Sequence, residues 1–390
     1  MKLFQRLLVA PAALGLLAPI TANATEFNVN DISNYSEGEI EIDSIDSIDS
    51  NSFKQDLKQN PLLISGGEGL VSEPSSGSFS TTTAASFSVD MSIGAQDNAP
   101  IGGAVSAPER TEAAYSFQMD LTTSFTGEDS LDISIDAGNA GGATAEFDGN
   151  TGGDALAVDG VAYTFPVGDA TVFVGDNTDG SALYNTACVY GGPSNTLDDC
   201  GNVNSAFAGS GTAAGASYDF GSGFTGAFGY AGDGSANGLM TEQGDDAYGG
   251  QLTYTADRFG ASVTWANVET AGVETRSTAF NGYWTPETTG IIPSISVGYE
   301  QDDSETVGVQ DTTSYMIGFQ WDEVGPGTLG TALGTLAPYA DDADELMMYE
   351  VFYSYPLNDG MSITPLVYFK EAPVGSEDIT GIMVKTSFSF

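Results

Sequence analysis

The sequence predicts an all-β fold in which about sixteen antiparallel strands close into a barrel. Many segments alternate between apolar and polar residues, as a strand with two different faces does. The connections between these segments are alternately short and long. The chain also ends on such a segment, Gly381–Phe390, with an aromatic last residue. Because a chain end frays unless something pairs with it, the last strand is expected to have a partner on each side.

The composition supports an ordered β structure and excludes several classes of function. The chain has 21 Phe, 17 Tyr and 50 Gly, with 41% hydrophobic residues and little helical periodicity. Its net charge of -45 excludes a surface for nucleic acid, which requires basic side chains. Histidine is absent, and so are the G-x-S-x-G motif and the P-loop. We therefore expect neither enzymatic activity nor a cofactor.

The first 24 residues have the features of a secretory signal peptide. Lys2 and Arg6 precede the apolar run Leu7–Ile20, and Ala22–Ala24 gives a small-x-small cleavage site. The alternative is a membrane anchor, which needs about 20 apolar residues. We expect cleavage after Ala24 and export of the mature chain.

Residues 25–77 differ from the rest of the chain. GEIEIDSIDSIDSNS places Asp43, Asp46 and Asp49 at every third position in a segment of low complexity. Such a like-charged segment is typical of a solvated, extended chain. We interpret residues 25–77 as an acidic periplasmic linker and residues 78–390 as the barrel.

The predicted barrel strands follow one another at regular intervals. Alternation is clearest in Phe87–Ile93 and Tyr115–Leu121, where every second residue is apolar. The predicted strands are Phe79–Ile93, Ala113–Phe125, Leu131–Ala137, Leu156–Phe165, Ala170–Gly175, Ala213–Phe220, Phe224–Ala231, Ala247–Thr255, Gly260–Asn267, Ser277–Thr285, Ile291–Glu300, Thr312–Trp321, Thr328–Thr335, Leu346–Tyr355, Met361–Lys370 and Thr380–Phe390.

The connections between these strands are sorted by length. Those after the even-numbered strands are short, at 127–130, 166–169, 221–223, 256–259, 286–290, 322–327 and 356–360. Those after the odd-numbered strands are longer and acidic, at 94–112, 138–155, 176–212, 232–246, 268–276, 301–311, 336–345 and 371–379. A soluble β-sandwich, the alternative, has no reason to sort its loops in this way. Alternation is typical of a transmembrane barrel with short periplasmic turns and long extracellular loops.

Aromatic residues near the strand ends provide a separate indication. Trp265 is expected at a loop end, Trp284 and Trp321 at turn ends, and Phe390 at the periplasmic rim. Together they would form an aromatic girdle, in which rings lie at the borders of the lipid. The alternative is that these are ordinary core aromatics.

The two cysteines, Cys188 and Cys200, lie in the longest loop. In an exported protein the expected state is a disulfide that closes a short loop. Two free thiols or a metal-binding pair are the alternative.

Several stretches resemble the cyanobacterial outer-membrane porins, relatives of the OprB-type carbohydrate-selective porins that are also called iron uptake porins. These stretches are MKLFQRLLVAPAALGLLAP, TEFNVNDISNYS, YTFPVGDATVFVG, GLMTEQGDDAYGGQLTY, DEVGPGTLG, YPLNDGMSITPLVY and MVKTSFSF. The resemblance implies a sixteen-stranded, trimeric barrel that admits small hydrophilic solutes. The surface-layer-homology domain usual after the signal in that family has no counterpart in residues 25–77.

In sixteen-stranded porins the loop after the fifth strand folds inward and narrows the pore. Here that loop carries four aspartates, and the period of two places Lys385 on the lumen face. The aspartates are Asp176, Asp179, Asp198 and Asp199. We therefore expect an acidic constriction that favours cations over anions. The alternative is that the loop lies over the mouth of the barrel.

Three acidic clusters lie in the predicted extracellular loops, but none has EF-hand spacing, so no specific metal site is predicted. They are Glu242/Asp245/Asp246, Asp302/Asp303/Glu305 and Asp341/Asp342/Asp344/Glu345. Expected partners are outer-membrane lipid, lipopolysaccharide and the barrel assembly machinery, for which a terminal Phe390 resembles the recognition signal. The alternative functions are a non-conducting, adhesin-like barrel and a secreted acidic calcium-repeat protein, although the G-G-x-G-x-D repeat is absent.

Overall fold

The computed structural model describes residues 83–97, 110–207, 211–234, 238–241, 244–270, 272–288, 290–306, 308–340 and 343–390. All of them belong to one unit of the chain, Gly66–Phe390. The predicted signal peptide and the predicted acidic linker lie outside the described residues.

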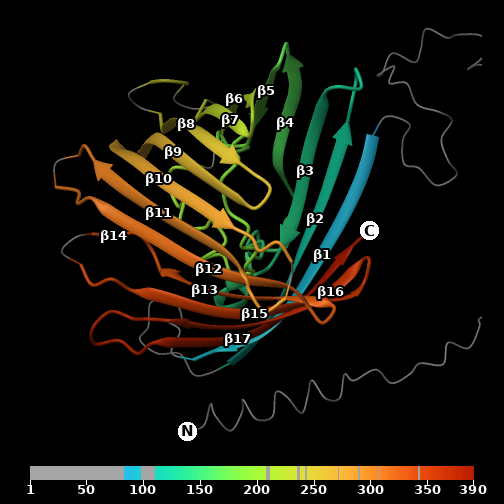
Figure 1. Cartoon of the computed structure of the whole chain (residues 1–390), viewed down its shortest axis with the longest axis vertical. Helices are drawn as coiled ribbons and strands as arrows, with labels where there is room; N and C mark the ends of the chain where they lie inside the picture. The colour runs from blue at the N-terminus through green and yellow to red at the C-terminus, as the bar shows by residue number, and fades with distance from the viewer. Residues whose placement is uncertain are drawn as a thin grey trace, which may run out of the picture. The chain divides into compact units, whose positions relative to one another are not determined.

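A single antiparallel sheet forms the wall, and each long strand pairs with the long strands before and after it in the sequence (Figure 1). The long strands are β1 (Thr83–Gln96), β2 (Arg110–Thr123), β3 (Ser130–Gly138), β4 (Ala157–Val167), β5 (Ala170–Asp176), β6 (Thr212–Gly221), β7 (Phe224–Gly232), β8 (Asp246–Thr255), β9 (Phe259–Thr270), β10 (Val273–Trp284), β11 (Ser294–Ser304), β12 (Thr312–Val324), β13 (Gly327–Thr335), β15 (Met347–Asn358), β16 (Met361–Lys370) and β17 (Ile379–Ser389).

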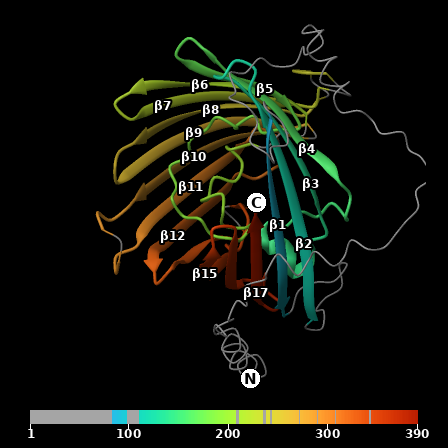
Figure 2. The same ribbon diagram turned by 90° about the vertical axis from the view of Figure 1, so that its right-hand side faces the viewer.

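The sheet closes on itself because β1 pairs with both β2 and β17 (Figure 2). Phe390 and Phe87 exchange two backbone hydrogen bonds, of 2.9 and 3.0 Å. Their rings stack with centroids 5.7 Å apart. The last residue of the chain is therefore paired, as the alternating terminal segment predicts.

One further strand, β14 (Tyr339–Ala340), has two residues and pairs only with the start of β12. A strand that crosses a bilayer needs about 9–11 residues, so β14 belongs to the connection between β13 and β15. The prediction of a closed antiparallel barrel of about sixteen strands is confirmed.

The wall has an apolar outer face and a polar inner face. On β9, Phe259 and Trp265 are 49% and 40% exposed, whereas Ser262 and Thr264 on the opposite face are 6% and 0% exposed. This is the reverse of a soluble barrel, which buries its apolar face, and it is the pattern of a barrel surrounded by lipid. Among the described residues, no helix has the length and apolar character that crossing a membrane requires.

The alternation of loop lengths fails at two successive connections. The predicted long loop 268–276 is a connection of two residues, because β9 and β10 stay paired up to Thr270 and Val273. Gly272, with a φ of +77°, supplies the left-handed conformation that such a tight turn needs. Conversely, the predicted short turn 286–290 extends over 285–293, between Trp284 and Ser294. Residues 268–270 and 273–276 continue the period of two, and pairing along that extension removes the loop.

Candidate functional site: the interior of the barrel

The longest connection, between β5 and β6, folds into the barrel. Its described part, residues 177–207, is called the inner loop here, and Figure 2 shows it inside the ring of strands. Leu197 and Phe207 of this loop are 1% and 4% exposed because they pack against the wall. The inner loop therefore occupies part of the lumen.

Polar side chains on the inner face of the wall hold the first half of the inner loop. Backbone N–H groups of the loop donate to one side chain after another as the loop passes across neighbouring strands. The pairs are Asn185 with Gln251 (2.5 Å), Ala187 with Ser262 (2.9 Å), Val189 and Tyr190 with Ser296 (3.0 and 3.1 Å) and Gly191 with Gln320 (2.9 Å). These bonds give the loop a fixed path, since a buried N–H group without an acceptor is costly.

The second half of the inner loop is tied to the first by a disulfide between Cys188 and Cys200, whose Cα atoms are 6.5 Å apart. The wall holds this half as well. Asn281 Nδ2 donates to the carbonyl of Cys200 at 3.0 Å. Glu300, which is fully buried, accepts the backbone N–H of Ser205 at 2.8 Å.

Two inner-face glycines allow the loop to approach the wall closely. A Cβ atom at Gly298 would lie 1.7 Å from the carbonyl oxygen of Cys200, and one at Gly229 would lie 1.8 Å from that of Gly180. Any side chain at either position would occupy the space of the loop backbone.

A second segment enters the barrel from the connection between β3 and β4. It contains the 3₁₀ helix η2 (Gly142–Phe147), which contacts β1, β2 and β17. Glu146 of η2 forms an ion pair with Lys370, and both side chains are mostly buried. Lys385 lies 5.4 Å from the centre of the Phe147 ring and 3.6 Å from Asp90. Lys385 thus lies on the inner face, and its charge is balanced by an acidic neighbour.

The two inward segments contact each other. The N–H of Asn195 donates to the carbonyl of Glu146 at 3.0 Å, and Thr196 Oγ1 donates to the Glu146 carboxylate at 2.7 Å. The inner loop and η2 therefore form one block that narrows the lumen from one side.

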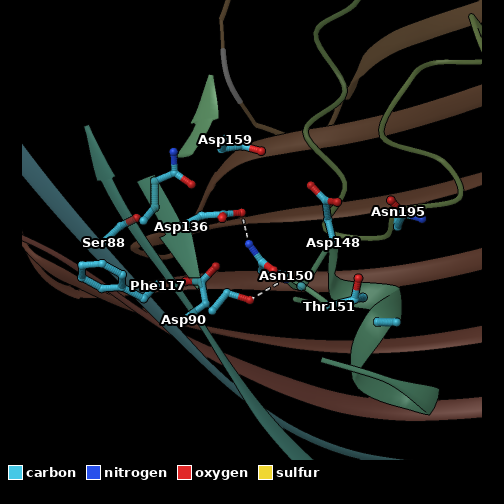
Figure 3. A pocket seen from close by; sticks show the side chains of 13 residues that line it. Ser88, Asp90, Phe117, Asp136, Asp148, Asn150, Thr151, Asp159 and Asn195 are labelled. Carbon is cyan, nitrogen blue, oxygen red and sulfur yellow. Dashed lines mark hydrogen bonds between the residues drawn. The ribbon is translucent and has the colours of Figure 1, made fainter. Parts of the chain in front are cut away.

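A polar cavity of about 660 Å³ remains between this block and the inner faces of β1–β4. Its lining includes Asp90, Asp136, Asp148 and Asp159, and no lysine or arginine is among the described residues that line it. Figure 3 shows Asp136 and Asp159 on the wall side of the cavity and Asp148 with Asn195 on the block side. Four carboxylates around one space give it a negative potential, which attracts cations and repels anions.

Two further aspartates lie on the inner loop, and Asp198 is close enough to Asp148 of the cavity for their charges to interact. Burial raises the pKa of Asp198 to about 6, and repulsion from Asp148 and Asp199 adds to the shift. Burial also raises the pKa of Asp199. The charge of the block formed by the inner loop and η2 therefore still changes near pH 6, where ordinary carboxyl groups are already ionised.

The four aspartates predicted for the constriction do not lie together. Asp176 is on the outward face of β5, with Val174, and accepts a hydrogen bond from Thr212 at 3.2 Å. Asp179 is exposed at the start of the inner loop. Only Asp198 and Asp199 lie on the part of the loop that enters the lumen.

The cavity aspartates themselves were not among the predicted site residues. The strand periodicity contains the signal for Asp90 and Asp136, because each lies on the polar face of a clearly alternating strand. Asp148 and Asp159 could not be found in this way. Asp148 follows a helix within a loop, and Asp159 lies at a bulge in β4, where the period of two is interrupted.

The predicted girdle residues lie on the outward face of the wall. Trp284 and Trp321 lie at the end of the barrel with the short turns, where Trp321 Nε1 donates to the Ile291 carbonyl at 2.8 Å. Phe390 is at the same end and is 75% exposed. Trp265 lies five residues before the end of β9 and not near its loop end, because β9 is longer than predicted.

Outward aromatic rings occur in pairs that are six residues apart on five strands. The pairs are Phe224 and Tyr230 on β7, Tyr248 and Tyr254 on β8, Phe259 and Trp265 on β9, Tyr315 and Trp321 on β12, and Tyr349 and Tyr355 on β15. Six residues correspond to about 20 Å along a strand. In each pair one ring lies near the short turns and the other lies farther toward the long loops, so the rings form two bands.

Comparisons with known proteins identify the class of the fold. No family model matches the chain, and no curated protein matches it. Among solved structures, it is similar to an anion-selective porin from Comamonas acidovorans, with a TM-score of 0.56 and 14% identity over 79% of this chain and 100% of that one. It is also similar to OprB from Pseudomonas putida, with a TM-score of 0.57 and 8% identity over 79% of this chain and 94% of that one.

A loop-deletion mutant of OmpT from Vibrio cholerae gives a TM-score of 0.55 at 9% identity, over 79% of this chain and 100% of that one. The chain therefore has the fold of the outer-membrane porins. At these identities the likeness concerns the fold alone.

Proposed function

We propose that the protein is an outer-membrane channel through which small hydrophilic solutes and ions diffuse passively. One observation carries the proposal, namely the polar cavity of about 660 Å³ between the inner block and β1–β4. The wall of sixteen long strands is wide enough for such a lumen. Its apolar outer face and the two bands of aromatic rings support a location in a lipid bilayer.

We propose further that the channel prefers cations. Asp90, Asp136, Asp148 and Asp159 line the cavity, and Asp198 lies beside it. Lys385 forms an ion pair with Asp90, which offsets both charges, so Asp136, Asp148 and Asp159 supply most of the remaining negative charge at the cavity. The inner loop and η2 would together act as the constriction.

The remaining features of this function rest on the sequence. A signal peptide at residues 1–24 supports export, and the acidic segment 25–77 would lie in the periplasm. The terminal Phe390 supports recognition by the barrel assembly machinery, and the apolar outer face supports contact with lipid and lipopolysaccharide. A homotrimer, and a relation to the OprB-type porins of cyanobacteria, remain proposals from the sequence resemblance.

Liposome swelling tests the channel. Liposomes that contain the purified protein should swell in isotonic neutral sugars at rates that fall steeply with sugar size, since the block narrows the lumen. No swelling with even the smallest polyol would favour a non-conducting barrel.

Reversal potentials in a salt gradient test the cation preference. Asp148→Asn combined with Asp159→Asn should lower the cation-to-anion permeability ratio. The control is Asp303→Asn, because Asp303 is exposed on the strand face opposite to the lumen. Anion preference in the unmodified protein would contradict the proposal.

A further inference from the structure

A second, smaller cavity lies at the long-loop end of β9–β12, the yellow and orange strands of Figure 1. It has a volume of about 240 Å³ and is separate from the channel cavity. Its lining comprises Asn204, Val268, Thr270, Val273, Thr275, Ser277, Asp302, Ser304, Val309, Gln310 and Thr312. Asn204 belongs to the inner loop, so the cavity lies where that loop meets the wall.

Two buried oxygens at this cavity have no hydrogen-bond partner among the described residues of the protein. Asp302 Oδ2 accepts from Asn204 Nδ2 at 2.9 Å and from Thr312 Oγ1 at 3.0 Å, but no described protein group donates to Asp302 Oδ1. Ser277 Oγ also lacks a partner, and Ser277 is directly opposite Asp302 in the register of β10 and β11. Asp302 is 2% exposed and Ser277 is 0% exposed. A buried oxygen without a partner is costly, so something in the cavity is expected to contact both oxygens.

The local charge is negative. Glu300 lies two residues before Asp302 on the same face of β11 and is also fully buried. The basic side chains that the structure describes form ion pairs with other carboxylates. These pairs are Arg258 with Glu287, Arg276 with Glu305, Lys370 with Glu146 and Lys385 with Asp90. Within the described part of the chain, no basic residue neutralises Glu300 and Asp302.

Ser277 and Asp302 face each other across β10 and β11, and both side chains are buried on the inner side of the sheet. A cation in the cavity would contact Asp302 Oδ1 and Ser277 Oγ together and would offset the charge of the two carboxylates.

We propose that this cavity binds one Ca²⁺ ion, with Asp302 Oδ1 and Ser277 Oγ as protein ligands and water at the remaining positions. Ca²⁺ takes 6–8 oxygen ligands at about 2.3–2.6 Å and accepts such mixed shells, whereas Zn²⁺ prefers nitrogen and sulfur. No three acidic or other strong metal-ligating side chains converge anywhere in the described residues. The affinity is therefore expected to be weak, with a Kd of about 10⁻⁴–10⁻³ M. The ion would fix Asp302 and, through it, Asn204 of the inner loop.

Equilibrium dialysis of the purified full chain against Ca²⁺ tests the proposal. A salt concentration of about 0.3 M KCl screens the many exposed carboxylates, so one saturable site per chain should remain. Asp302→Asn should weaken binding at least tenfold, and Ser277→Ala about threefold, both relative to the unmodified protein. Because Ser277→Ala changes no charge, it keeps the test valid if Asp302→Asn does not fold.

Asp303→Asn is the matched control. Asp303 is the next residue of the same type, but it lies on the exposed face of β11, where it accepts from Gln301 at 3.2 Å. It should leave the affinity unchanged. The proposal is overturned if the protein has no saturable Ca²⁺ site below about 10 mM. It is also overturned if Asp303→Asn weakens binding as much as Asp302→Asn does, or if a crystal grown with Ca²⁺ contains only water beside Asp302.

Discussion

Replacing Gly298 by alanine should push the inner loop away from the wall. The new Cβ atom would lie 1.7 Å from the carbonyl oxygen of Cys200. These two atoms must separate by about 1.7 Å before they reach the 3.4 Å of an ordinary contact. The strand cannot yield by that amount without losing its ladder to both neighbours, so the loop should move into the lumen. The hydrogen bond from Asn281 to Cys200 would then be lost, at about 1 kcal/mol.

Overpacking of this kind usually costs about 1–3 kcal/mol, and we expect the free energy of unfolding of Gly298→Ala to fall by that amount. Denaturant unfolding in detergent measures the loss, and single-channel recording should show a lower conductance, because the loop moves toward the open part of the lumen. The control is Gly282→Ala, where a Cβ atom would meet nothing closer than the Gly260 carbonyl at 3.5 Å. If both variants match the unmodified protein in stability and conductance, the inner loop does not lie against β11 as described.

Three further predictions concern the inner block. Removing the disulfide by the double change Cys188→Ser and Cys200→Ser should lower the free energy of unfolding by about 2–3 kcal/mol, for a sequence separation of 12 residues; an unchanged value would contradict this. Because the pKa of Asp198 is raised to about 6, the folded protein holds that proton more tightly than the unfolded chain does. The contribution of Asp198 to stability should therefore fall as the pH rises from about 4 to about 6. The cation-to-anion permeability ratio should rise over the same range, and Asp198→Asn should remove this step from the measured ratio. Finally, Lys370→Met should cost about 3 kcal/mol, because it leaves the mostly buried Glu146 carboxylate without its cation. Adding Glu146→Gln should restore most of that loss in a double-mutant cycle, and no recovery would refute the pairing.

The wall of the barrel could be predicted because its information is local. A period of two, with the side chains of Phe87 and Met91 on one face and of Ser88 and Asp90 on the other, repeats in most strands and is independent of distant contacts. The same rule places Lys385 on the inner face. The rule fails where a polar segment continues a strand although its composition is typical of a loop. This happens at residues 268–276, which extend β9 and β10.

The interior could be predicted only in part. The inward path of the β5–β6 connection depends on acceptors such as Gln251, Ser296 and Glu300, which lie 66 to 107 residues away in sequence from the N–H groups they bind. No local pattern contains such pairings. The entry of η2 into the lumen depends likewise on Lys370, at a separation of 224 residues from Glu146. For this reason the sequence indicated an acidic constriction but assigned it to loop residues, whereas most of the carboxylates at the cavity belong to β1, β3, β4 and the η2 segment.

Current through a planar lipid bilayer tests the central claim most directly. If the purified protein encloses a water-filled lumen with an acidic lining, its addition should produce discrete, equal steps of current. In a KCl gradient, the reversal potential should have the sign that indicates a higher permeability for K⁺ than for Cl⁻. A protein that inserts with its native resistance to denaturation but produces no current steps would contradict the claim.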